Sequence, residues 1–146
     1  MTGKVLSFYL KGKMLGLDIN LVKEISRRFE YSRVPDSNPH IVGLMNLRGQ
    51  VVTLFDLGQM LGLSNVTGTE DQNNHTACII LKAPPDNPDV VGFLIDQSGD
   101  VLDIQQEWCE KTPANVEEIN GEYISEVVKL NDQLLLILDT AQVFEL

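Results

Sequence analysis

The acidic and hydroxyl side chains most suggestive of chemistry lie in DQSGDVLDIQQE, residues 96–107. Asp96, Ser98, Asp100 and Glu107 fall at several ligand positions of a calcium-binding EF-hand loop. Such a loop requires glycine at its sixth position, where this stretch has Val101, and its flanks predict strands instead of helices. We therefore interpret these carboxylates as solvated acidic turns and predict no calcium site.

Other reactive residue types are scattered along the chain. His40 and His75 have no acidic or cysteine partner at metal-ligand spacing, and Cys78 and Cys109 have no motif spacing. No serine lies in a nucleophile elbow, and no glycine-rich phosphate loop or Cys–His signature occurs. The sequence therefore predicts no catalytic residue, no metal and no cofactor, with both cysteines present as reduced thiols.

One arginine, in the stretch NLRGQVVTLFDL, is hard to explain by folding alone. Gly49 can take the positive φ that a tight turn requires, whereas the Arg48 side chain adds nothing to a turn. Near the C-terminus, KLNDQLLLILDT repeats this unit with Asn131 and Asp132 in place of Arg48 and Gly49. Because the second copy closes without an arginine, we interpret Arg48 as a binding residue.

The composition limits the classes of partner. The 146 residues are the length of one ordinary domain, and a 43% apolar share fits a globular protein. Eleven Lys and Arg against 21 Asp and Glu give a net charge of -10, which opposes binding to phosphate backbones and anionic lipid surfaces. No window approaches the roughly 20 apolar residues of a membrane span, and the start, MTGKVLSFYL, has no signal-sequence pattern. We predict a soluble, cytoplasmic protein that binds no nucleic acid and does not insert into membranes.

Short strand patterns bounded by turn signals dominate the chain. The predicted strands are Val5 to Leu10, Met14 to Ile19, Arg28 to Val34, Gly43 to Leu47, Val51 to Phe55, Thr76 to Leu81, Val90 to Ile95, Asp100 to Ile104, Glu126 to Leu130 and Gln133 to Leu138. Short helices are predicted after the N-cap residues Asp56 and Asp139, and a brief one at Asn20 to Ile25. The polar, turn-rich stretch from Gly62 to Asn74 is the natural boundary between halves, and we expect it to be accessible to proteases.

The two halves of the sequence are related. Ile41 to Leu63 aligns without a gap on Ile124 to Leu146, with six identities: Ile41 and Ile124, Leu47 and Leu130, Gln50 and Gln133, Asp56 and Asp139, Gln59 and Gln142, Leu63 and Leu146. This match indicates a duplicated strand-turn-strand-helix unit, and upstream GLDINLVKEI and GFLIDQSGDVLDI echo each other more loosely. Many short strands and a duplication favour two small barrels packed together, with a groove between them.

These residues carry a resemblance to a known family. VPDSNPHIVGLMNLRGQVVTLFDL, VVGFLIDQSGDVLDI and the closing EVVKLNDQLLLILDTAQVF resemble the chemotaxis coupling protein CheW over nearly the whole chain. The most specific part is Gly-x-x-Asn-Leu-Arg-Gly, here Gly43 to Gly49, followed by Asp56-Leu57. The resemblance implies a mainly β fold of two interlocked five-stranded SH3-like barrels with a few short helices. It also implies one CheW-like domain over residues 1–146, with approximate sub-barrels at residues 1–66 and 67–146.

The function that the resemblance implies is that of an adaptor without chemistry of its own. It would link the cytoplasmic tips of methyl-accepting chemoreceptors to the regulatory domain of the histidine kinase CheA, in the cytoplasm at membrane-associated receptor arrays. The positions that match the family's receptor-binding groove are Val22, Glu24, Gly43, Asn46, Arg48 and Val101. By position alone, Tyr31, Val34 and Pro35 of the first barrel would contact the kinase.

Several alternatives stay open on the sequence. Gly43 suits a close backbone approach as well as a binding role, and Val22 and Val101 suit the core equally well. A CheW-like coupler of another chemosensory or pilus-motility pathway has the same sequence features. A small-ligand or nucleic-acid binding double barrel is a further alternative, although nine aromatic residues and a net charge of -10 disfavour a nucleic-acid groove.

Overall fold

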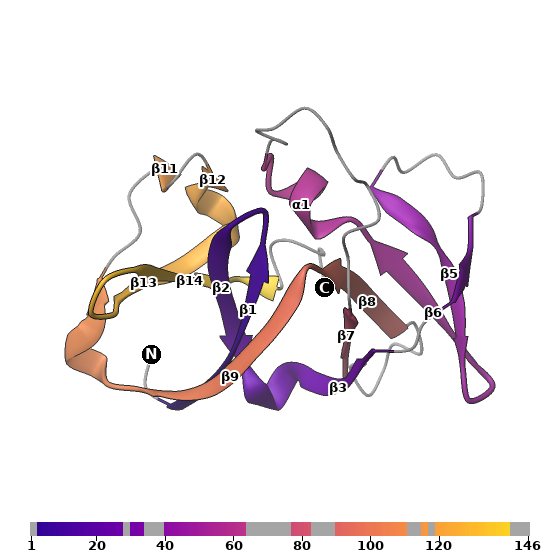
Figure 1. Ribbon diagram of the computed structural model, residues 1–146, viewed down its shortest axis with the longest axis horizontal. Helices are drawn as coiled ribbons and strands as arrows, with labels where there is room; N and C mark the ends of the chain where they lie inside the picture. The colour runs from indigo at the N-terminus through magenta and orange to yellow at the C-terminus, as the bar shows by residue number, and fades with distance from the viewer. Residues whose placement is uncertain are drawn as a thin grey trace.

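Two curled β-sheets make up the structure, as the strand patterns predict (Figure 1). The computed structural model describes residues 3–27, 30–33, 40–63, 77–82, 90–110, 115–116 and 119–140. In spatial order, the central sheet consists of β3 (Val22–Ser26), β7 (Ala77–Leu81), β8 (Val90–Ile95), β6 (Gln50–Phe55), β5 (Ile41–Leu47) and β4 (Tyr31–Ser32). The terminal sheet consists of β10 (Cys109–Glu110), β13 (Ile124–Lys129), β14 (Leu134–Leu138), β2 (Lys13–Asp18), β1 (Gly3–Leu10) and β9 (Gln97–Ile104).

Other elements are short. A two-stranded ribbon pairs β11 (Asn115–Val116) with β12 (Ile119–Asn120), α1 covers Leu57–Met60, and 3₁₀ turns η1, η2 and η3 cover Ile19–Leu21, Gln106–Trp108 and Gly121–Tyr123. Each six-stranded sheet has five strands of at least five residues and one two-residue edge strand, β4 or β10. The prediction of a mainly β fold with two small five-stranded barrels is confirmed.

The sheets are interlocked because each half of the sequence contributes strands to both. The hairpin β1–β2 joins β9, β10, β13 and β14 of the C-terminal half, whereas the hairpin β7–β8 joins β3 to β6 of the N-terminal half. Corresponding strands occupy the same places in the orders β9-β1-β2-β14-β13-β10 and β3-β7-β8-β6-β5-β4. The predicted boundary between residues 66 and 67 lies outside the described residues and stays a prediction.

The hydrogen bonding confirms the duplication of the β5–β6 and β13–β14 hairpins. Both are antiparallel, and both shift register at the same place, between Ile41 and Gly43 in the first copy and between Ile124 and Glu126 in the second. The looser echo upstream is also real, since each hairpin pairs in parallel with a strand that carries a glycine, Gly92 of β8 or Gly16 of β2.

The predicted aspartate cap after β6 is present. The Oδ1 atom of Asp56 accepts a hydrogen bond from the Gln59 N–H at 3.1 Å, and α1 begins at the next residue, Leu57. The backbone contact of Asp56 is repeated in the second copy. The Asp56 N–H donates to the His40 carbonyl oxygen at 2.8 Å, and the Asp139 N–H donates to the Tyr123 carbonyl oxygen at 2.9 Å. The helix predicted after Asp139 extends outside the described residues.

Long apolar runs such as ACIIL in β7 arise because both faces of these strands are buried. Cys78 and Ile80 of β7 belong to the core of the central sheet, whereas Ile79 on the opposite face belongs to a cluster that both sheets share. That shared cluster includes Phe8 from β1 and Phe93 from β8, whose ring centroids lie 5.5 Å apart. Close packing of the shared cluster therefore joins the two barrels into one unit.

Two local predictions are wrong or incomplete. The helix predicted at Asn20 to Ile25 is instead the 3₁₀ turn η1 followed by strand β3, because β3 pairs with the buried strand β7 over Val22–Ser26. Tertiary pairing outweighs the local helical pattern here, although Asp18 does cap η1 by accepting the Asn20 N–H at 2.9 Å. Of the strand predicted at Arg28 to Val34, only Tyr31–Ser32 is a strand within the described residues.

A buried serine bonds to the backbone where the pairing of β1 with β9 is irregular. Their register shifts between Leu6 and Phe8, and Ser7, which is 1% exposed, lies at that shift. Its Oγ donates to the Asp100 carbonyl oxygen at 2.7 Å and accepts the Asp100 N–H at 2.9 Å. A Cβ at Gly99 would meet the Ser7 Oγ at 2.4 Å, so a glycine is needed beside it. Most of the stretch with calcium-loop character, Gln97–Ile104, is therefore strand β9 with its own backbone pairing, whereas Glu107 lies in the 3₁₀ turn η2.

Replacing Ser7 with alanine is expected to lower the free energy of unfolding by about 1–2 kcal/mol, because the Asp100 N–H and C=O both lose their partner in a part-buried site. Ser125→Ala is the control, since this exposed serine donates to the Ile137 carbonyl oxygen in a long bond of 3.4 Å that water can replace. Equal denaturant midpoints for the two variants would contradict the bridging role of Ser7.

Neither Cys78 nor Cys109 is in a disulfide, in agreement with the prediction of reduced thiols. Cys78 is fully buried in the central sheet, and burial raises the pKa of its thiol to about 11. A buried thiol that stays protonated near neutral pH is chemically inert.

Among the helices of the described residues, none is long and apolar enough to cross a membrane.

Candidate partner-binding site

The turn between β5 and β6 places Arg48 in a left-handed conformation. The φ angles are 51° at Arg48 and 86° at Gly49, which is typical of a two-residue type I′ hairpin turn. Asn46 supports the turn, since its Oδ1 accepts the Gly49 N–H at 2.9 Å. Most residues other than glycine and asparagine are sterically disfavoured there. The turn geometry therefore does not explain an arginine.

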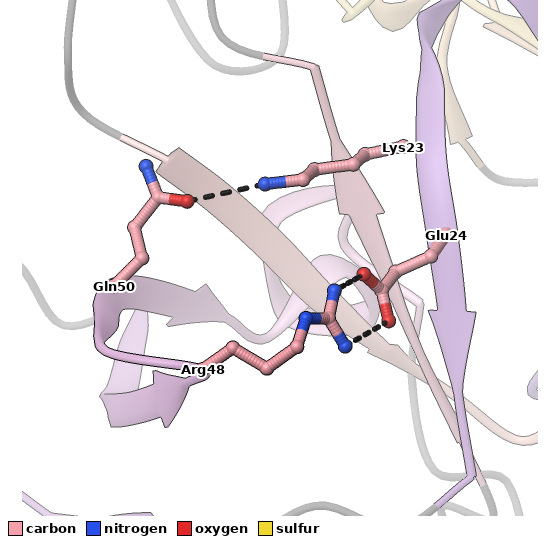
Figure 2. Close-up of polar contacts among 4 residues, drawn as sticks. All are labelled: Lys23, Glu24, Arg48 and Gln50. Carbon is pink, nitrogen blue, oxygen red and sulfur yellow. Dashed lines mark hydrogen bonds and ion pairs between the residues drawn. The ribbon is translucent and has the colours of Figure 1, made fainter.

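Arg48 meets Glu24 of β3 through both ends of its guanidinium group. Nη1 donates to Oε1 at 3.4 Å, and Nη2 donates to Oε2 in a shorter contact (Figure 2). The hydrogen bond and the negative charge of Glu24 raise the pKa of Arg48 above its usual value. The Arg48 side chain is 67% exposed and that of Glu24 is 27% exposed. The guanidinium thus remains open to a partner while Glu24 orients it.

A β-bulge lets two neighbouring residues of β3 reach the same turn. The pairing of β3 with β7 shifts register between Val22 and Glu24, so Lys23 and Glu24 both point toward the β5–β6 turn instead of to opposite faces (Figure 2). Lys23 Nζ donates to Gln50 Oε1 at 3.1 Å, next to the Glu24–Arg48 pair. We call these four residues, Lys23, Glu24, Arg48 and Gln50, the clasp.

The clasp closes the central sheet. In the order β3-β7-β8-β6-β5-β4, the strands β7 and β8 separate β3 from β6. Contacts between β3 and the β5–β6 turn therefore join parts of the curled sheet that are not neighbours in the strand order. Directly after β3, Arg27 Nη2 donates to Ser98 Oγ on β9 at 2.9 Å. The clasp therefore lies beside the place where edge strands of the two sheets meet.

The structure brings together some of the predicted receptor-binding residues and separates others. Glu24, Arg48 and Asn46 lie at the clasp and its turn. Val22 is half-buried and packs against the shared cluster, whereas Val101 of β9 is 51% exposed and so is not a core residue. Gly43 lies farther along β5, away from the turn.

Gly43 makes the close backbone approach that the sequence left open. A Cβ at this position would lie 2.3 Å from the Ser32 carbonyl oxygen of β4 and 3.0 Å from the Tyr31 ring. No side chain fits at that distance from backbone atoms. Gly43 is therefore required by the pairing of β4 with β5, whether or not a partner touches it.

Comparison with known proteins identifies the family. A family model for the CheW-like domain matches residues 4–146. This chain belongs to the CheW-like domain family. A Chemotaxis protein CheW of Bacillus subtilis is 30% identical over 142 residues, covering 97% of this chain and 86% of the relative. The corresponding protein of Thermotoga maritima is 28% identical over 143 residues, covering 97% and 87%.

A solved structure has the same fold as this CheW-like domain. The crystal structure of the scaffolding protein TtCheW from Thermoanaerobacter tengcongensis superimposes with a TM-score of 0.82 and 25% sequence identity. The match covers 100% of this chain and 94% of the other. The fold of two interlocked barrels is thus shared over all of this chain and most of the other.

Of the predicted kinase-binding residues, Tyr31 lies on β4 at the opposite edge of the central sheet of the CheW-like domain. Tyr31 on β4 lines an open pocket of about 380 Å³ together with Glu30, Ser32, Leu44, Met45, Asn46 and Leu47. Leu44 is 37% exposed there, so the pocket offers apolar as well as polar surface. Val34 and Pro35 lie outside the described residues.

Sequence reasoning missed two clasp residues of the CheW-like domain. The local pattern around Lys23 predicts a helix, and Gln50 is distinguished in the sequence only by its match to Gln133 in the second copy. No local pattern pairs them, since they are 27 residues apart in sequence.

Within the described residues, no group of three or more His, Cys, Asp or Glu residues could hold a metal ion.

Proposed function

We propose that this CheW-like domain is a chemotaxis scaffold that couples the cytoplasmic tips of methyl-accepting chemoreceptors to the histidine kinase CheA. The observation that carries the proposal is the family match over residues 4–146, together with relatives named chemotaxis proteins and a neighbour named a scaffolding protein. The protein acts in the cytoplasm and is recruited to membrane-associated receptor arrays by these contacts.

The receptor contact in this proposal centres on the clasp. The exposed Arg48 guanidinium can exchange a bond to Glu24 for one to a carboxylate or carbonyl of a receptor helix, because its planar fork donates paired hydrogen bonds. Asn46 holds the turn, and Val101 supplies exposed apolar surface on β9. Val22 and Gly43 complete the predicted set.

The kinase contact in this proposal uses the edge of the central sheet. The pocket beside Tyr31 combines exposed Leu44 with the polar groups of Glu30 and Ser32, a mixture that suits a protein surface better than a small charged ligand. The regulatory domain of CheA would dock there, and Val34 and Pro35, which lie outside the described residues, stay predicted contacts from the sequence alone.

A co-purification experiment tests both contacts. Immobilised CheW-like domain should retain CheA and a soluble chemoreceptor tip fragment, separately and together. Retention of a kinase from another chemosensory or pilus-motility pathway, but not of CheA, would reassign the coupler to that pathway. Binding of single-stranded oligonucleotides with neither protein retained would instead support a nucleic-acid binding double barrel.

We expect no enzymatic turnover and no phosphoryl transfer to the chain. The sequence has no phosphate-loop or nucleophile motif, and the described residues contain no group of three or more His, Cys, Asp or Glu residues that could hold a metal ion. Incubation with radiolabelled ATP and phosphorylated CheA should therefore leave the chain unlabelled, while a receiver domain in the same tube accepts the label. Stoichiometric labelling of the chain would contradict a purely adaptor role.

A further inference from the structure

Asn46 belongs both to the β5–β6 turn and to the pocket beside Tyr31. Its Oδ1 accepts the Gly49 N–H at 2.9 Å, directly next to Arg48, and the same residue lines the pocket together with Tyr31 and Leu44. Asn46 is exposed on β5, so its bond to the turn competes with water. A single side chain therefore connects the surface assigned to the receptor with the surface assigned to the kinase.

The second copy of the hairpin uses the same position differently. The two hairpins pair with their edge strands, β4 and β10, in the same register, and Lys129 of β13 occupies the place of Asn46. Lys129 Nζ lies 3.2 Å from Oε1 of Glu110 on β10, whereas Ser32 of β4 occupies the place of Glu110 and lines the pocket. In the second copy this position therefore joins the hairpin to its edge strand, whereas Asn46 bonds to its own turn beside an open pocket.

The bond to Gly49 fixes the direction of the Asn46 amide. Because Oδ1 accepts the Gly49 N–H, the Nδ2 group with its two donors is the part of the amide that a partner in the pocket can use. Glu30 also lines the pocket, and its negative charge disfavours a carboxylate of the partner. Leu44 is 37% exposed there. The partner group that fits is a carbonyl oxygen next to an apolar side chain.

The order of the Asn46 amide depends on the order of the turn. Arg48 has a φ of 51°, which is unfavourable for arginine, so a partner that holds the Arg48 guanidinium also holds the turn in this conformation. We propose that Asn46 is a positioning residue that couples the two proposed contacts. Receptor binding at Arg48 orders the turn, the turn orders the Asn46 amide, and the ordered amide donates to a carbonyl oxygen of CheA. This proposal rests on the function proposed above.

Titration calorimetry of full-length CheA into the CheW-like domain, with and without a saturating soluble chemoreceptor tip fragment, tests the coupling. The fragment should raise the CheA affinity of wild type about two- to tenfold more than that of Asn46→Ala, the range for prior immobilisation of one side chain. A direct contact between CheA and the fragment would act equally on both proteins. Because coupling is reciprocal, CheA should raise the receptor affinity by the same factor.

The variant Asn46→Asp distinguishes coupling from a direct receptor contact. Aspartate keeps an oxygen for the Gly49 N–H but lacks the amide donors, so this variant should keep the receptor affinity of wild type and lose the coupling. Both proteins are compared at about 1 M salt, where a Debye length of about 3 Å screens the added charge. Ser32→Ala is the control, because Ser32 lines the same pocket from β4, and it should keep the full coupling. All three variants should melt close to wild type, since both positions are exposed.

Each contrary outcome has a different meaning. An equal effect of the fragment on wild type and Asn46→Ala would overturn the coupling and leave the proposed function intact. A loss of receptor affinity in Asn46→Asp, with the coupling kept, would also overturn it, because Asn46 would then be a receptor contact, as the family resemblance implies. A wild-type domain that binds neither CheA nor the fragment would contradict the proposed function, and the coupling with it.

Discussion

Replacement of Arg48 with alanine is expected to weaken binding of the chemoreceptor tip by about tenfold to a hundredfold, the range for losing a charge-assisted contact. The melting temperature should hardly change. Arg48 is 67% exposed, and its bonds go to a partly exposed carboxylate that water can solvate in its place. Binding of CheA should survive, because the pocket beside Tyr31 does not include Arg48.

The variant Arg48→Asn distinguishes the binding role of the Arg48 side chain from its effect on the turn conformation. Asparagine tolerates the left-handed conformation better than arginine, so Arg48→Asn should keep or slightly raise the melting temperature while losing receptor affinity as fully as Arg48→Ala does. Receptor affinity and melting temperature should be measured on the same preparations by calorimetry. A variant that melts far lower and binds neither partner would show that Arg48 is a structural residue.

The β1–β2 turn offers a matched control for Arg48. Lys11 and Gly12 have φ angles of 53° and 81°, so Lys11 is a cation in the same backbone position of the same turn type. Lys11→Asn should therefore change the backbone and the net charge as Arg48→Asn does, without touching the clasp. Its receptor affinity should equal that of wild type, and a matching loss would point to charge alone.

Gly43→Ala is expected to lower the free energy of unfolding by about 3 kcal/mol, at the upper end for an overpacked site. The added Cβ would lie 2.3 Å from the Ser32 carbonyl oxygen, and backbone atoms cannot rotate away as a side-chain tip can. Relief requires β4 to move off β5, which also displaces Tyr31. CheA binding should consequently fall, and chemical denaturation and kinase affinity are the measurements.

Ser32→Ala is the control for Gly43→Ala, because it changes the β4 side chain but leaves the carbonyl that Gly43 faces. It should unfold close to wild type, since Ser32 is exposed. If Gly43→Ala instead kept full stability and lost only receptor binding, Gly43 would be a contact residue, as the family resemblance implies. The experiment therefore decides between the two roles that the sequence left open.

Much of the fold follows from local sequence because strand, turn and cap signals are local. Alternating and continuous apolar runs predicted most of the strands, and Asp56 predicted the start of α1. The fixed offset between the two hairpins predicted a duplication that the register of both copies confirms. The same comparison marked Arg48 as a residue that its turn does not need, and its unfavourable φ of 51° agrees.

Tertiary structure alone decided how the two halves combine and what the clasp contains. Residues 20–25 have a local helical pattern, but β3 is a strand because β7 offers it a ladder of backbone hydrogen bonds. The exchange of the β1–β2 and β7–β8 hairpins between sheets depends on burying a shared core, which no local window encodes. Glu24 and Arg48 are 24 residues apart in sequence, and only a bulge in β3 turns Lys23 toward the same turn. Local sequence specifies conformational preference, whereas these contacts arise from pairing and packing between distant segments, where the larger free energies lie.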